Sequence, residues 1–110
     1  MPAMLKSYVN SELLITPGEL EQRLRGSVPP VVLDLRAAEK FAQGHVPGAV
    51  HLDLFGVSLI DTRPAPLEAF LWMVGHLLTT RGVSQHRRTV VYDGQSGIRA
   101  ARAFWFLELF

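Results

Sequence analysis

Hydrophobic residues in this chain form short, nearly continuous runs that alternate with segments of helical periodicity. The runs at 31–35 and 89–92 are typical of strands that are buried on both faces. A shorter run at 13–15 and a brief strand at 50–52 add two further strand signals. Because the segments between the runs show helical spacing, strand and helix signals alternate along the chain.

Four helices are predicted from this spacing. They cover residues 17–25, 37–43, 67–80 and 98–110. Before the first helix Thr16 can serve as a cap, Pro17 suits the first helical position, and Glu19 completes a capping box. The third helix has one apolar face, which should pack on a core. The last helix is apolar nearly all round, so either a further element covers it or the chain is interrupted within it.

The alternation of the two element types predicts the fold class. We expect an α/β fold with a parallel sheet that helices cover on both faces. The 110 residues, 48% of them hydrophobic, suffice for a single domain that spans 1–110. Pro47 and Gly48 suit the central positions of a type II turn, and the segment 53–66 is expected to be irregular.

Charge and composition exclude several classes of function. A net charge of +1, with Lys and Arg scattered, gives no electrostatic case for nucleic acid or an acidic membrane as partner. The absence of Cys excludes disulfides, thiolate metal sites and thiolate chemistry. His51, His76 and His86 are isolated, so no metal site is expected, and no cofactor is predicted. Because no apolar stretch is long enough for a signal peptide or a membrane span, we expect a cytoplasmic protein.

A glycine-rich loop joins the strand at 89–92 to the last helix. The segment comprises Asp93, Gly94, Gln95, Ser96, Gly97, Ile98 and Arg99. Such a loop aims backbone N–H groups at one point, which suits a thiolate, an oxyanion or a bound anion. A serine hydrolase acting through Ser96 and a phosphoaspartyl enzyme acting through Asp93 are less favoured alternatives. For the first, almost no chain follows Ser96 to supply the His and the acid of a triad. For the second, Gln95 stands where a second acid is needed.

Two motifs resemble those of rhodanese-like sulfurtransferase domains. One is the strand at 89–92 with Asp93, its loop and the Arg-Ala-Ala-Arg-Ala helix. The other contains Asp34, Arg36, Glu39, Gly44, His45, Pro47 and Gly48. The resemblance covers about 13–110 and implies the same fold. It also implies a fragment that lacks the last strand, because the family continues past the last helix with a Gly-Gly-Trp turn and a strand.

In catalytic members of this family a cysteine stands where Asp93 stands here, and it carries the transferred sulfur as a persulfide. A carboxylate cannot hold a sulfane sulfur, so the resemblance implies no catalytic residue in this chain. In two-domain members the N-terminal domain looks like this one, and the second domain carries the nucleophile. The resemblance therefore implies the noncatalytic half of a thiosulfate or 3-mercaptopyruvate sulfurtransferase, partnered by its catalytic domain. A stand-alone inactive binding or regulatory module, or self-association, is the alternative.

Several residues allow two interpretations. Asp93 could cap the following turn, or it could order the loop as the remnant of an anion cradle. Asp34 and Arg36 could bind a ligand at the strand end, although structural pairing is favoured. Arg99 could bind an anion or be solvated, whereas Arg102 is expected to be solvated.

The remaining candidates are expected to have mainly structural roles. His45 should fix its turn rather than act as a base. Of Phe104, Trp105 and Phe106, we expect most in the core and one or two at an interface with a catalytic domain.

Overall fold

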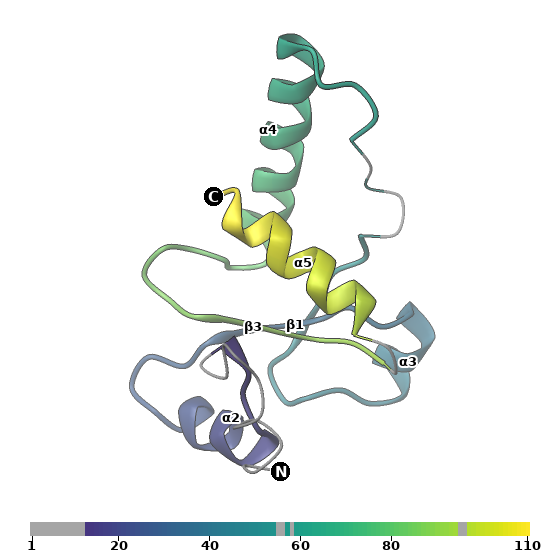
Figure 1. The fold of residues 1–110 in the computed structure, drawn as a ribbon. Coiled ribbons are helices and arrows are strands. Elements are labelled where there is room, and N and C mark those ends of the chain that lie inside the picture. Colours follow the sequence, from purple (N-terminus) through teal and green to yellow (C-terminus); the bar gives the residue numbers. More distant parts are fainter. Residues whose placement is uncertain (1–12, 55–56, 58, 95–96) are drawn as a thin grey trace. The chain divides into compact units, whose positions relative to one another are not determined.

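The computed structural model has two compact units, Met1–Pro30 and Val31–Phe110, and each is described by itself. The structure describes residues 13–54, 57, 59–94 and 97–110 (Figure 1). Gln95 and Ser96 of the predicted glycine-rich loop lie outside the described residues. Within the described ranges, no helix has the length and apolar character needed to cross a membrane.

The N-terminal unit contains helix α2 (Pro17–Leu24), which begins at the predicted cap. Thr16 Oγ1 accepts a hydrogen bond from the backbone N–H of Glu19 at 3.2 Å. The Thr16 hydroxyl in turn donates to the Glu19 carboxylate at 3.1 Å, so that carboxylate pairs with the hydroxyl and not with a backbone N–H. The run at 13–15 forms no strand, because three apolar residues specify a strand only where a neighbouring strand pairs with them.

The second unit is built on a parallel sheet of three strands among the described residues. These strands are β1 (Val31–Asp34), β2 (Val50–His51) and β3 (Thr89–Tyr92), in the order β2-β1-β3. The register aligns Leu33 with Val50 on one side and with Val91 on the other. The predicted parallel α/β class is therefore confirmed, and the carboxyl ends of the three strands meet at one edge of the sheet.

Two helices pack against one face of this sheet. They are α4 (Pro64–Thr80) and α5 (Ile98–Glu108). In Figure 1, α5 lies over β1 and β3, and α4 extends away from the strands. Leu33, Val74 and Phe106 are buried together in the core that the helices form with the sheet. The ring of Phe106 lies 5.9 Å from that of Phe70 in α4, so aromatic contact joins the two helices.

Helix α4 begins three residues earlier than the apolar spacing predicts. The segment 53–66 was expected to be irregular, but Pro64 and Pro66 already belong to the first turn of the helix. Proline is tolerated there because the first N–H groups of a helix have no intrahelical acceptor. The apolar periodicity starts only at Leu67, which is why that pattern places the helix start too late.

A short helix and a tight turn lead from β1 to β2. The helix is α3 (Ala38–Gln43), and the turn follows it. Ala49 N donates to Val46 O at 2.9 Å, and Gly48 between them has φ +81°. This geometry confirms the predicted type II turn, whose third position requires positive φ and therefore favours glycine.

Candidate functional site

A buried carboxylate organises the carboxyl end of β1. Asp34 accepts hydrogen bonds from the backbone N–H of Arg36 at 2.9 Å, from its Nε at 3.1 Å and from its Nη2 at 2.8 Å. The Tyr92 hydroxyl donates to Asp34 Oδ2 at 2.7 Å and accepts from Val46 N at 3.1 Å. Arg36 Nη2 also donates to Gly44 O at 2.6 Å. These contacts join β1, β3 and the turn after α3.

Electrostatics favour the ionised form of Asp34 despite its burial. Desolvation raises the pKa of the carboxyl, but the hydrogen bonds from Arg36 and Tyr92 outweigh it and lower that pKa from 3.8 to about 2. The pKa of Tyr92 is raised by burial and by its bond to Asp34. Because the oxygens of Asp34 are occupied by protein donors, the favoured structural pairing with Arg36 is confirmed.

The residues around α3 have local structural contacts. The ring of His45 stacks on that of Phe41 with centroids 3.7 Å apart, and its Nδ1 lies 2.8 Å from Phe41 O. His51 Nε2 lies 2.8 Å from Arg36 O. Glu39 is exposed in the first turn of α3. The expectation that His45 fixes its turn is confirmed, since the ring is held by this stacking and by the Phe41 carbonyl.

Asp93 is joined to the start of α5. Its Oδ2 accepts a hydrogen bond from the backbone N–H of Ala100 at 2.9 Å. The residue at the N-cap position, Gly97, has no side chain with which to cap. Asp93 therefore takes over the capping role from seven residues upstream of Ala100, and its negative charge lies near the positive end of the helix dipole. The capping interpretation of Asp93 is confirmed.

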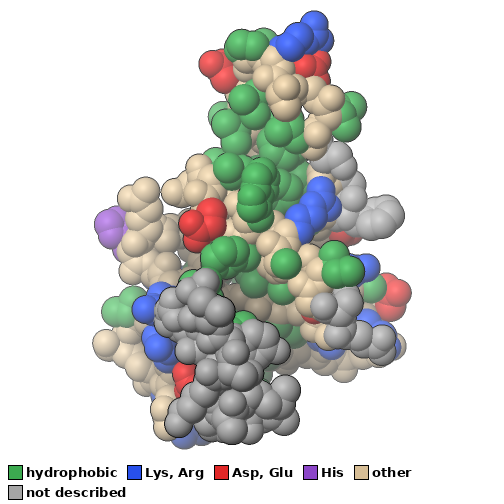
Figure 2. Space-filling model, in the orientation of Figure 1, with side chains coloured by type: hydrophobic (Ala, Val, Ile, Leu, Met, Phe, Trp, Pro, Cys, Tyr) green, Lys and Arg blue, Asp and Glu red, His purple; other side chains and the backbone are tan. Residues whose placement is uncertain are grey.

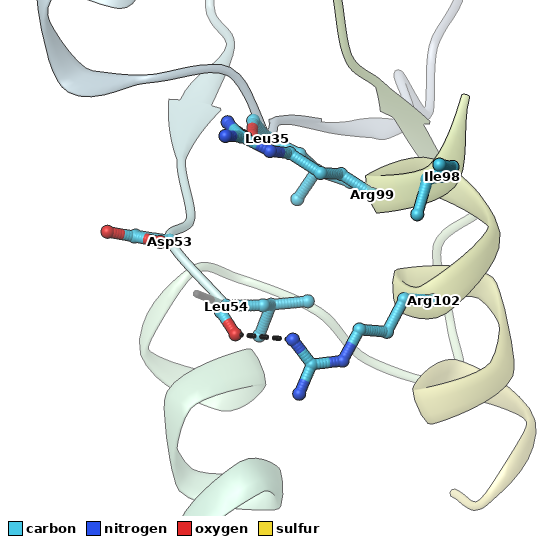
Figure 3. A pocket seen from close by; sticks show the side chains of 6 residues that line it. All are labelled: Leu35, Asp53, Leu54, Ile98, Arg99 and Arg102. Carbon is cyan, nitrogen blue, oxygen red and sulfur yellow. Dashed lines mark hydrogen bonds between the residues drawn. The ribbon is translucent and has the colours of Figure 1, made fainter. Parts of the chain in front are cut away.

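A pocket of about 120 Å³ lies outside the carboxyl ends of the strands (Figure 3). Residues from the segments that follow each of the three strands line it. We call it the arginine pocket. Its lining consists of Leu35, Asp53, Leu54, Ile98, Arg99 and Arg102. In open parallel sheets this edge is where ligands bind.

Both arginines of this pocket are held by backbone carbonyls. Arg99 Nη1 donates to Leu35 O at 3.1 Å, and Arg102 Nη1 donates to Leu54 O at 2.8 Å. Arg102 also lies over the ring of Phe106, 5.3 Å from its centroid. The expectation that Arg102 is merely solvated is wrong, because its side chain reaches across to a segment 48 residues away. The sequence held no signal for Leu54, which lies in the segment expected to be irregular.

The aromatic residues of α5 are less buried than expected. Phe106 is 5% exposed, but Phe104 is 39% and Trp105 is 59% exposed. The expectation that most of the three lie in the core is wrong, because α5 turns only one side toward the sheet and α4. Figure 2 shows apolar side chains gathered over α4 and α5. Between these helices and Thr89 of β3 lies a groove of about 510 Å³.

Comparison with known proteins identifies the family to which the chain is similar. The model of the rhodanese-like domain family matches residues 16–110. The thiosulfate sulfurtransferase of Azotobacter vinelandii is 32% identical over 114 aligned residues, covering 96% of this chain and 38% of that protein. The thiosulfate sulfurtransferase of Pseudomonas aeruginosa is 32% identical over 88% of this chain and 35% of its own length. The 3-mercaptopyruvate sulfurtransferase of Escherichia coli K12 is 34% identical over 70% of this chain and 27% of its own length.

The chain thus spans less than two fifths of the length of these relatives. No solved structure matches the chain significantly. The family match includes both segments that resemble the family, the strand end at Asp34–Arg36 with its following turn and the strand, loop and helix around Asp93. With a parallel α/β sheet that carries these segments at its carboxyl edge, the chain belongs to the rhodanese-like domain family.

Proposed function

We propose that this chain is the noncatalytic, N-terminal domain of a two-domain sulfurtransferase. The parent protein moves sulfane sulfur from thiosulfate or a mercapto acid to a thiophilic acceptor such as cyanide, and its nucleophilic Cys lies in a second domain. The observation that carries the proposal is the hydrogen bond between Asp93 and Ala100 N. At the position where the family's nucleophile is expected, the side chain caps a helix.

The chemistry of sulfur transfer supports this assignment. A thiolate is a polarisable nucleophile that can take up a sulfur atom as a persulfide and release it to an acceptor. A carboxylate forms no such persulfide, and this chain contains no Cys. The parallel sheet, the turn after α3 and the capped helix α5 retain the scaffold of the family. The domain would therefore contribute a folded contact surface to the parent protein, and not a reacting group.

Two surface features favour a partner that packs against this domain. Phe104, Trp105 and Phe110 are exposed along and just beyond α5, which is unusual for a helix that faces solvent. Among the described strands β3 pairs on one side only, with β1. A strand edge beside a large apolar groove favours pairing with further chain, either of the same protein or of a second copy.

Thiosulfate:cyanide sulfurtransferase activity, measured as thiocyanate, tests the proposal. It should be assayed on the 110-residue chain and on the chain extended to the natural stop codon of its gene. Activity in the extended protein alone would support the assignment of this chain as the noncatalytic half. Activity in the 110-residue chain would refute the role assigned to Asp93. If neither protein is active, the stand-alone binding module is favoured. We also propose a cytoplasmic location, which cell fractionation tests.

A further inference from the structure

We propose that the arginine pocket binds a small oxyanion of the size of thiosulfate, sulfate or phosphate. The inference rests on the geometry of the pocket and goes beyond the proposed function, which assigns no ligand to this domain. It is carried by two arginines that face one cavity at the carboxyl edge of the sheet. Figure 3 shows both side chains extending from α5, Arg99 toward Leu35 after β1 and Arg102 toward Leu54 after β2.

The charge of the pocket favours an anion. Arg99 and Arg102 lie three residues apart on α5, so both project from the same face of the helix. In the part of the chain that the structure describes, the ion pairs are Arg25–Glu21, Arg36–Asp34 and Arg63–Asp61, and neither pocket arginine is among them. Asp53 is the acidic residue of the lining, and it takes part in an interaction within the protein. In Figure 3 its carboxylate points away from both guanidinium groups.

The two guanidinium groups are held in place by hydrogen bonds that use only some of their N–H donors. Each arginine has five N–H donors. Among the described residues, each uses one of them on a backbone carbonyl, that of Leu35 or that of Leu54. These bonds fix the side chains, while the remaining donors keep the planar fork that binds two oxygens of an oxyanion at once. An anion that enters the pocket would find its donors already in place.

The walls and the volume limit the ligand. Buried Leu35 and half-buried Leu54 supply apolar wall, beside which charge-assisted hydrogen bonds are stronger than in bulk water, whereas Ile98 is 71% exposed at the solvent side. A cavity holds one water when its volume reaches roughly 10–15 Å³. The volume of about 120 Å³ therefore admits a compact anion of a few non-hydrogen atoms, whereas drug-sized ligands occupy pockets of about 300 Å³ or more.

Titration of the 110-residue chain with sodium thiosulfate, sulfate and phosphate tests the site. Ionic strength is held constant with sodium chloride, and binding is followed by calorimetry and by the NMR signals of the arginine Nε–H groups. We expect saturable binding at one site, with Nε–H shifts at Arg99 and Arg102. The anion that binds most tightly identifies the ligand, and saturable binding of any of the three supports the site. The absence of saturable binding by all three would overturn it.

Matched variants separate this site from general charge attraction. Arg99→Gln and Arg102→Gln should each weaken binding about tenfold or more, because each removes charge-assisted hydrogen bonds to the anion. Arg23→Gln removes the same charge from exposed α2 and should leave the affinity unchanged. An equal loss in Arg23→Gln, or an unchanged affinity in Arg99→Gln, would overturn the proposal.

Arg102 also contacts Leu54 and Phe106, so its variant needs a check of folding by circular dichroism. Arg99 is exposed, and Arg99→Gln keeps the test decisive if Arg102→Gln fails to fold. Binding is measured without turnover, so its outcome is independent of the sulfurtransferase assay. Anion binding without sulfurtransferase activity would contradict only the proposed function. Activity without anion binding would contradict only the anion site.

Discussion

Replacing Tyr92 with Phe removes one hydroxyl that joins three segments of the domain. That hydroxyl donates to the buried Asp34 at 2.7 Å and accepts from Val46 N at 3.1 Å. A hydrogen bond to a charged group contributes about 1.5–3 kcal/mol, and one between neutral groups about 0.5–1.5 kcal/mol. We therefore expect Tyr92→Phe to lower the free energy of unfolding at pH 7 by about 2–4.5 kcal/mol.

The same substitution should change the acid sensitivity of the protein. The pKa of Asp34 lies at about 2 in the folded protein, against 3.8 for an unperturbed aspartate side chain. At about 1.4 kcal/mol per pKa unit, this difference corresponds to about 2.5 kcal/mol of stability. Because the folded pKa is depressed, that contribution is present above pH 3.8 and is lost as the pH falls toward 2. In Tyr92→Phe the pKa of Asp34 should rise, so less stability is lost over this range.

Urea denaturation followed by circular dichroism, at several pH values between 7 and 3, measures both effects. By pH 3 the wild-type protein should have lost about 1 kcal/mol through Asp34 alone, and the variant less. A loss below about 0.5 kcal/mol at pH 7 would refute the contribution assigned to the hydroxyl, since that is the size of an ordinary surface substitution. An identical acid dependence in both proteins would refute its influence on Asp34.

Three further substitutions, one of them with a matched control variant, test other parts of the structure by denaturation at pH 7. Asp93→Ala should cost about 1 kcal/mol, because the N–H of Ala100 loses its cap, and an unchanged stability would contradict that role. Phe106→Ala should cost about 3–5 kcal/mol through the cavity it leaves, whereas exposed Trp105→Ala should cost much less, and equal losses would argue against the burial of Phe106. Gly48→Ala should cost about 1–2 kcal/mol because of the positive φ, and a stabilised variant would contradict the type II turn.

The sequence alone was sufficient for features that depend on near neighbours. Apolar runs at 31–35 and 89–92 predict the strands of a parallel sheet, since buried strands need continuous apolar residues. The turn at Pro47 and Gly48 and the cap at Thr16 follow from backbone preferences over four residues. The absence of Cys excludes thiolate chemistry in this chain whatever its fold.

Other features depend on residues that only folding brings together. Tyr92 meets Asp34 across 58 residues, because parallel pairing of β3 with β1 aligns their ends. The arginine pocket depends on Arg102 reaching Leu54, and the exposure of Trp105 depends on which side of α5 faces α4. Periodicity reports which residues share a face of one element, but not what lies opposite that face. The opposing surface is determined by strand register and helix packing, which arise from contacts between distant parts of the chain.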